Sequence, residues 1–386
     1  MHRTHPDSVA ELRALHSTLI AWLVNDAYPR WQAHGIDRQN GGFFEALAPS
    51  GVGLPDPRRA RVHPRQIYAF AQARTFGWRG DVGGIVRRGT QYFTARYRRS
   101  DGLFRALVAA EGTVLDDRAL LYDQSFALLG WAAAAEALDA HAEFEEQALA
   151  LRSRIENAFS AADGSFYSEE GAENIRESNP HMHLLEACLA WANDGEEGGW
   201  AAWVRRLVEI AVSRFIRTDS GALGESYTAA WQPSPGLAGR LIEPGHQFEW
   251  GWLLLRCEHF HPFPLREQAL RLLAIGEQFG VHRGVAVNQL LDDFTVADPG
   301  ARCWPQTERL KAALLAAKLT GEPHYWDVAH AAAVSLLPYL NTPVAGLWFD
   351  LKKPDGAFAD SPAPASTFYH VVGALAALNA ALRPPV

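Results

Sequence analysis

The chain has 386 residues, a hydrophobic fraction of 48%, a charged fraction of 21% and a formal net charge of −8 at pH 7. Its 19 Phe, 13 Trp and 10 Tyr residues exclude a largely disordered chain, and the absence of basic runs excludes nucleic acid and anionic membranes as expected partners. The three cysteines show no CxxC spacing and no signal-peptide-like segment opens the chain, so we expect buried free thiols and a cytoplasmic protein.

Two kinds of predicted helix alternate along the chain. Amphipathic helices, with apolar residues recurring every three or four positions, are expected at about residues 8–28, 84–98, 142–159, 199–217, 264–280 and 323–340. Alanine-rich helices that are apolar nearly all round begin at about Arg65, Asp123, His183, His246, Gln306 and His370, at intervals of 58 to 64 residues. A helix without a polar face must be buried, so the apolar helices are expected to lie inside a layer of amphipathic ones.

A Gly-centred turn followed by strand-like residues repeats with the same period. The turns lie at Gly42, Gly102, Gly164, Gly221, Gly284 and Gly346, at intervals of 57 to 63 residues. Two series of landmarks with one period indicate six repeats of outer helix, turn with a short strand, and inner helix. We therefore predict an all-α fold, an (α/α)6 barrel of six helical hairpins with short β-strands in the loops over one end, formed by residues 1–386 as a single domain. An open solenoid is the alternative, but neither terminal repeat is polar enough to cap one.

A barrel of this kind would bring the six polar residues that begin the inner helices to one end. There they would converge around one funnel, where helix N-termini offer unpaired N–H groups to oxygen-rich ligands. Aromatic walls with a few convergent polar groups are typical of small-molecule pockets. Tyr122 and Trp304, beside the starts of inner helices, would line the funnel, and Arg65 would bind hydroxyls or a developing oxyanion.

Three of the 15 histidines, His183, His246 and His370, begin inner helices. Imidazole titrates near neutral pH, so two histidines facing each other suit a reaction that removes a proton and returns it. Glu186 and Glu249 follow the first two by three residues, on the same helix face, where each carboxylate could orient its histidine. The three histidines could also bind a metal, but the chain has no compact ligand motif such as HExxH, and we expect none.

Two other classes of protein fit this pattern in part. A glycoside hydrolase with the same barrel would use two carboxylates, for which Asp123, Glu186, Glu249 and Glu308 are the candidates. The histidines would then have no role, so we rank a hydrolase below a proton-transfer enzyme. A catalytically silent sugar-binding protein is the second alternative, and it would tolerate replacement of His370 without loss of ligand binding.

Six segments, one in each repeat, are similar to motifs of the N-acylglucosamine 2-epimerase superfamily. They are RVHPRQIYAFAQA (61–73), LYDQSFAL (121–128), NPHMHLLEA (179–187), EPGHQFEW (243–250), RCWPQTERLKA (302–312) and ASTFYHVVGAL (365–375). The fourth and sixth resemble the forms found in bacterial D-mannose isomerases and related aldose–ketose isomerases more than those of disaccharide epimerases. The resemblance implies an (α/α)6 barrel and a metal-free proton transfer at C1 and C2 of an opened sugar, through a cis-enediolate.

The resemblance also implies roles for individual residues. His246 and His370 match the family's acid/base pair, and Glu249 would support His246. The substrate-binding residues that we expect are Arg65, Tyr122, Asn179, His183, Trp304, Glu308 and Lys311. The motif at Arg65 is imperfect, because His63 and Pro64 occupy the two places before it.

The expected reaction is isomerisation of D-mannose to D-fructose, and of D-lyxose to D-xylulose. Epimerisation at C2, of glucose and mannose or of an N-acylglucosamine, is the alternative, because both subfamilies carry both histidines. A free monosaccharide is expected, since a phosphate would need more positive charge than Arg65 and Lys311 provide. We expect no cofactor, and the chain to act as a monomer or homodimer.

Overall fold

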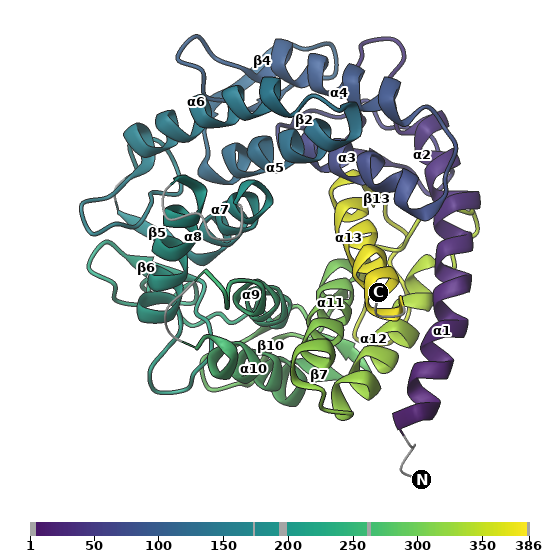
Figure 1. The fold of residues 1–386 in the computed structure, drawn as a ribbon, viewed down its shortest axis with the longest axis vertical. Coiled ribbons are helices and arrows are strands. Elements are labelled where there is room, and N and C mark those ends of the chain that lie inside the picture. Colours follow the sequence, from purple (N-terminus) through teal and green to yellow (C-terminus); the bar gives the residue numbers. More distant parts are fainter. Residues whose placement is uncertain (1–4, 173, 193–198, 261–263, 384–386) are drawn as a thin grey trace.

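The computed structural model describes residues 5–172, 174–192, 199–260 and 264–383. In this part of the chain the helices form two concentric rings (Figure 1). The inner ring consists of α3 (Val62–Ala71), α5 (Leu121–Leu138), α7 (Ser178–Trp191), α9 (Pro244–Arg256), α11 (Cys303–Thr320) and α13 (Ala365–Leu382). The outer ring consists of α1 (His5–Trp22), α2 (Tyr28–His34), α4 (Val82–Tyr97), α6 (His141–Phe159), α8 (Gly199–Ile210), α10 (Arg266–Ile275) and α12 (His324–Leu340). Short 3-10 or π-helical segments extend some of them: η1 (Leu23–Ala27), η2 (Gln72–Phe76), η3 (Ala211–Phe215) and η4 (Gly276–Gly280).

Contacts between the two ends of the chain close the ring. The last inner helix, α13, packs against the first, α3, and the first outer helix, α1, packs against the last, α12. Strand β1 (Ala46–Leu47) pairs antiparallel with β13 (Ala363–Pro364), which directly precedes α13. These contacts confirm the predicted (α/α)6 barrel and exclude an open solenoid, in which the terminal repeats would not meet.

The two rings differ in burial as their sequences predict. In the inner helix α5, every residue from Asp123 to Ala135 is buried. In the outer helix α6, the buried residues recur every three or four positions: Phe144, Ala148, Leu151, Ile155 and Phe159. By length and composition α13 could span a membrane, but 61% of it is buried inside the protein, as expected of a core helix. The three cysteines are free and buried, as predicted.

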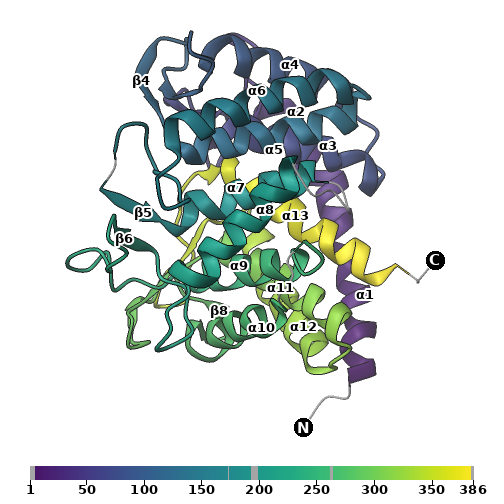
Figure 2. The ribbon, with the colours of Figure 1, turned by 60° about the vertical axis from the view of Figure 1, so that its left-hand side comes forward.

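All six Gly-centred turns lie in the loops that precede inner helices. Their glycines have φ values between 73° and 86°, in the left-handed region that favours glycine. The loops form small antiparallel pairings at one end of the barrel, away from the chain termini in Figure 2. The strands are β2 (Arg58–Arg59), β3 (Arg105–Val108) and β4 (Val114–Ala119), β5 (Ile175–Glu177) with β6 (Ser226–Thr228), β7 (Val281–His282) with β8 (Val285–Ala286), β9 (Gln289–Leu290) with β10 (Val296–Asp298), and β11 (Ala301–Arg302) with β12 (Leu351–Lys352).

A buried side chain near the start of an inner helix ties that helix to its Gly-centred turn in five of the repeats. It is a glutamine or histidine that hydrogen-bonds the backbone of the residue one or two positions after the glycine. The pairs are His63 with Phe43, Gln124 with Phe104, His181 with Phe166, Gln247 with Leu223, and Gln306 with Ala286. Because buried backbone groups need partners, these contacts fix the position of each loop above its helix.

This register corrects two expectations. The inner helices begin two to five residues earlier than we predicted. The polar residues at their starts also do not occupy equivalent positions, because His246 precedes Gln247 by one residue whereas His183 follows His181 by two. Gln306 belongs to the set that holds the turns, so its side chain is not available to a ligand.

Candidate active site

Side chains from the inner helices meet at the loop end of the barrel. Their exposure orders them by depth: His246, His370, Trp304 and Arg65 keep 5–7% of their surface exposed, whereas Glu308 keeps none. A ligand that arrives from the loop end would therefore meet the two histidines, the indole and the guanidinium, with the carboxylate of Glu308 beneath them.

His246 lies at the start of α9 and faces two carboxylates. Its Nδ1 donates a hydrogen bond to Oε2 of Glu225 at 2.8 Å, and Oε2 of Glu243 lies 3.7 Å from the same nitrogen. Burial alone would lower the pKa of His246, but the charges of Glu225 and Glu243 outweigh it and raise the pKa to about 10. His246 is therefore an imidazolium at neutral pH, with Nδ1 held in place and Nε2 left to donate a proton.

Glu225, and not Glu249, orients His246. We expected Glu249 in that role because it follows one turn later on α9, but its Oε1 lies 4.0 Å from Nδ1 of His183 on α7. Glu225 is itself fixed at the loop end, since its Oε2 accepts from the Ser178 hydroxyl at 3.0 Å and its Oε1 accepts from a backbone N–H at the start of α9 at 3.1 Å. The carboxylate thus joins the starts of α7 and α9 beside the imidazole.

His370 lies on α13 and has a different electrostatic setting. Its Nδ1 donates to Oε1 of Glu308 at 2.8 Å, and Nζ of Lys311 lies 2.7 Å from Oε2 of the same glutamate. Burial, followed by the positive charges of Arg65 and Lys311, lowers the pKa of His370 well below its ordinary value. His370 is therefore neutral at neutral pH, and with its proton on Nδ1 the lone pair is on Nε2.

The ring of Trp304 lies close to both histidines. Its ring centroid is 5.3 Å from that of His246 and 5.5 Å from that of His370. Two imidazoles in opposite protonation states therefore lie close to one aromatic ring. Titratable groups whose pKa values are pushed apart in one site can serve as an acid and a base.

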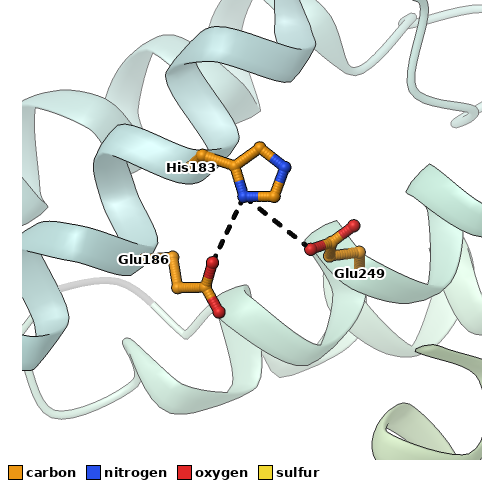
Figure 3. Close-up of side chains that lie close together, drawn as sticks. All are labelled: His183, Glu186 and Glu249. Atoms are coloured by element: carbon orange, nitrogen blue, oxygen red, sulfur yellow. Dashed lines mark hydrogen bonds and ion pairs between the residues drawn. The ribbon is translucent and has the colours of Figure 1, made fainter. Parts of the chain in front are cut away.

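A second cluster joins α7 and α9 (Figure 3), and Tyr369 of α13 adds to it. Nδ1 of His183 donates to Oε2 of Glu186 at 3.2 Å, which confirms the predicted pairing of these two residues, and the Tyr369 hydroxyl donates to Oε1 of Glu186. Burial alone would raise the pKa of Glu186, but the bond from His183 and the charge of Lys311 lower it to about 2. Burial lowers the pKa of His183 to about 4, so its ring is neutral and Nε2 can accept a hydrogen bond.

Glu249 lies between the two clusters. One of its oxygens is within 4.8 Å of ligand atoms of His183 and Glu186, and one is equally close to those of Glu308 and His370. Burial and the charge of Glu308 raise the pKa of Glu249 well above its ordinary value. Its surroundings therefore favour the protonated form of Glu249, in which the carboxyl group can donate a hydrogen bond.

Several buried polar atoms of the site have no hydrogen-bond partner among the described residues. Arg65 donates through one terminal nitrogen to the Tyr122 hydroxyl at 2.5 Å, and its guanidinium lies 4.1 Å from the ring centre of Phe126. The atoms without partners include Arg65 Nε, Asn179 Oδ1 and Trp304 Nε1. Buried polar groups are ordinarily hydrogen-bonded, so these atoms suit a ligand rich in hydroxyl groups.

Asp123, a candidate for two-carboxylate chemistry, is already paired. Its fully buried carboxylate lies 2.9 Å from Nε of Arg61, whose guanidinium lies over the ring of Tyr122. Glu308, the other candidate near a helix start, is held by Lys311. Pairs already bound to cations do not provide the free acid and base of a glycoside hydrolase.

Residues 42–374 match the sequence model of the family described as N-acylglucosamine 2-epimerase (GlcNAc 2-epimerase). The chain belongs to this family. It is 43% identical over 95% of its length to a protein of Rhizobium meliloti (strain 1021) named mannose-6-phosphate isomerase, of which 97% is covered. Its fold matches a crystal structure of D-mannose isomerase with a TM-score of 0.84 at 23% identity, and a cellobiose 2-epimerase from Spirochaeta thermophila DSM 6192 with a TM-score of 0.85 at 22% identity. Both matches cover 96% of this chain and 97% of the other.

Membership of the N-acylglucosamine 2-epimerase family makes this protein an enzyme of the sugar isomerase and epimerase class. It confirms the resemblance that the six motifs indicated. The two solved structures share the fold and belong to an isomerase and an epimerase. The choice between these reactions therefore rests on the side chains of this chain's own site.

The sequence analysis missed Glu225, although a repeated signal marks its position. In five of the repeats, the carbonyl of one residue after the Gly-centred turn accepts from a backbone N–H at or near the start of an inner helix, and we call this position the step. The residues at this step, four after the turn glycine and in the first repeat three, are Glu45, Ala106, Ser168, Glu225, Asn288 and Asp350. Asp350 accepts from the Thr367 hydroxyl as Glu225 does from that of Ser178. A search for polar residues at this step would have found Glu225.

Proposed function

We propose that this enzyme interconverts D-mannose and D-fructose, and D-lyxose and D-xylulose, by metal-free proton transfer through a cis-enediolate. The observation that carries the proposal is the pair of histidines whose rings both lie close to that of Trp304, with His246 cationic and His370 neutral. The name of the relative in Rhizobium meliloti supports a substrate with the mannose skeleton. We assign His246, His370 and Glu249 as the catalytic residues.

The remaining site residues fall into two groups, those that would contact the sugar and those that contact His370. Arg65, Tyr122, Asn179, His183 and Trp304 would contact the sugar, because they carry the more exposed or unpartnered polar atoms and rings. The other two predicted substrate-binding residues, Glu308 and Lys311, are occupied with each other and with His370. They would act on the sugar only through that histidine.

The proposed reaction moves one proton between two carbons. Nε2 of His370 removes the proton from C2 of the open-chain aldose while His246 donates a proton to O1, which forms an enediol. His370 then returns its proton to C1 and His246 takes the proton from O2, which leaves the ketose. The guanidinium of Arg65 would stabilise the negative charge that develops on the oxygens.

We expect this chemistry to need no metal ion. Two groups of side chains in the site have the spacing of metal ligands, namely His183 with Glu186 and Glu249, and Glu249 with Glu308 and His370. A cation would have to compete with Lys311 for Glu308 and would have to deprotonate Glu249. The donor atoms are thus already committed to protons and to an ammonium group.

We propose a free sugar as the substrate, although the name of the 43% identical relative refers to a phosphorylated one. A phosphate carries a charge close to −2 at neutral pH and would have to approach the carboxylates of Glu225 and Glu243. Two of the nearby cations are engaged, since Arg61 pairs with Asp123 and Lys311 pairs with Glu308.

NMR of D-mannose incubated with chelator-treated enzyme in D2O tests the proposal. Formation of fructose without added metal is the expected result. Glucose with deuterium at C2 as the main product would instead identify a 2-epimerase, the alternative that the second histidine keeps open. Turnover of D-mannose 6-phosphate in preference to mannose would overturn the assignment of a free sugar.

A further inference from the structure

We propose that Glu225 is a positioning residue that fixes His246 as the cationic member of the histidine pair and thereby directs the site to isomerisation rather than 2-epimerisation. This inference rests on the proposed function, because it concerns which product the proposed proton transfer forms. The geometry behind it is a difference between two similar contacts. Glu225 and Glu308 each accept a hydrogen bond from Nδ1 of a histidine at 2.8 Å, but their own partners differ in charge.

Glu308 shares its charge with a cation, whereas Glu225 does not. The ammonium group of Lys311 lies 2.7 Å from Glu308, so His370 faces a neutral pair. In the described part of the chain, the partners of Glu225 other than His246 are a hydroxyl and a backbone N–H, which are uncharged. A carboxylate with uncharged partners keeps its full attraction for an imidazolium.

The other charged and titratable groups around His246 are Glu243 just before α9, Glu249 on α9, His183 on α7 and Arg302 at the start of α11. Glu243 faces His246 directly, with its Oε2 3.7 Å from Nδ1. Arg302 faces Trp304 instead, with its guanidinium 5.6 Å from the centre of the ring. His183 is neutral, and the raised pKa of Glu249 favours its neutral form. The raised pKa of His246 agrees with this arrangement.

Isomerisation and epimerisation differ in the state in which they leave the two histidines. In isomerisation, His370 removes the proton from C2 and transfers it to C1. His246 donates a proton to O1 and then accepts one from O2. Each histidine ends in its starting form. In 2-epimerisation, His370 takes the C2 proton from one face and His246 gives its proton to C2 on the other face. The pair then ends inverted, with a cationic His370 and a neutral His246.

Glu225 makes the inverted state unfavourable. A neutral His246 would leave the carboxylates of Glu225 and Glu243 without the cation that both of them face. A cationic His370 would lie near Arg65 and Lys311, which are both positive. Isomerisation has this state only at the enediol intermediate and leaves it as the ketose forms, whereas epimerisation ends in it with the product. The charge of Glu225 therefore favours fructose over glucose as the product of mannose.

Glu225→Gln tests the inference, because the amide keeps the size of the side chain and removes its charge. Two readouts on D-mannose are needed: the ratio of glucose to fructose formed, and the alkaline limb of the pH profile of kcat. Loss of one carboxylate should move the alkaline limb down by roughly 1–3 pH units. Each unit by which the pKa of His246 falls raises the share of its neutral form tenfold, so the ratio should rise by about tenfold or more.

A matched control removes an acid of the same type elsewhere. Glu258→Gln breaks the surface pair with Arg266 and should change neither the ratio nor the limb. Glu243→Gln removes the second carboxylate and keeps every hydrogen bond that Glu225 makes, so it tests the charge even if Glu225→Gln does not fold. It should move the limb in the same direction by a smaller amount. If the folded variants keep both the alkaline limb of the pH profile and the ratio of glucose to fructose unchanged, the inference is overturned.

The ring-nitrogen chemical shifts of His246, followed by ¹⁵N NMR against pH, separate this inference from the proposed function. If the wild-type enzyme does not convert mannose, the proposed function fails. A lower titration midpoint of His246 in Glu225→Gln would still support the role of Glu225 in holding the cation. An unchanged midpoint would overturn that role whatever the substrate.

Discussion

The ammonium group of Lys311 lies 2.7 Å from Oε2 of Glu308, and both side chains are almost completely buried. The other oxygen of Glu308 accepts the Nδ1 hydrogen of His370. Lys311 therefore cancels a charge that would otherwise favour the imidazolium form of His370. A carboxylate compensated in this way can orient a histidine and still leave it neutral, as a general base must be.

Lys311→Met should move the acidic limb of the pH profile of kcat to higher pH. A base with a lowered pKa is active above that pKa, so wild-type activity should extend far below pH 6.5. Without Lys311, the negative Glu308 raises the pKa of His370, and the limb should move up by roughly 1–3 pH units. Lys318→Met, at the exposed end of the same helix, is the control and should leave the limb in place. Loss of activity at every pH, with no movement of the limb, would contradict this role of Lys311.

His246→Asn and His370→Asn should each lower kcat by roughly 10²–10⁴, the usual contribution of a general acid or base. Both side chains are close to solvent at the loop end, so the variants should fold, which circular dichroism can check. His141→Asn, at the exposed start of α6, is the control. Full activity in either site variant would rule out the proposed proton transfers.

Glu249→Gln should cost much less activity than His246→Asn. The raised pKa of Glu249 favours the neutral acid form of its side chain, and a glutamine amide has nearly the same shape and can also donate a hydrogen bond. A decrease of kcat by less than about tenfold is expected, compared with the larger loss from removing a general acid. A loss equal to that of His246→Asn would mean that Glu249 itself carries a proton in the reaction.

The repeat made the fold predictable from the sequence. Six glycines with one spacing all have a positive φ, and the buried faces of α5 and α6 follow the apolar patterns of their sequences. Ring closure could be inferred from the apolar terminal repeats, and the pairing of β1 with β13 confirms it. The helix starts were less predictable, because the first turns carry polar residues such as Gln124 that look like site residues and serve instead to hold the turns.

The site was predictable in its residue types and less so in its pairings. The pairing of His183 with Glu186 lies within one helix turn, so spacing alone gave it. The partner of His246 comes from the loop before β6, 21 residues earlier, and that of His370 from a neighbouring helix 62 residues away. Contacts of this kind depend on how loops and helices lie in the barrel, which helical periodicity does not describe.

Gln124→Leu tests the structural role of the side chains that hold the Gly-centred turns. Oε1 of Gln124 accepts from the backbone N–H of Phe104 at 2.8 Å, and its Nε2 donates to the Phe104 carbonyl at the same distance. Leucine fills similar space but leaves both buried backbone groups without partners, each at a cost of about 1–3 kcal/mol. The free energy of unfolding should therefore fall by about 2–5 kcal/mol, measured as a lower urea midpoint. Gln91→Leu, at an exposed position of α4, should leave the midpoint nearly unchanged, and an equally small effect of Gln124→Leu would mean that the turn is held by other contacts.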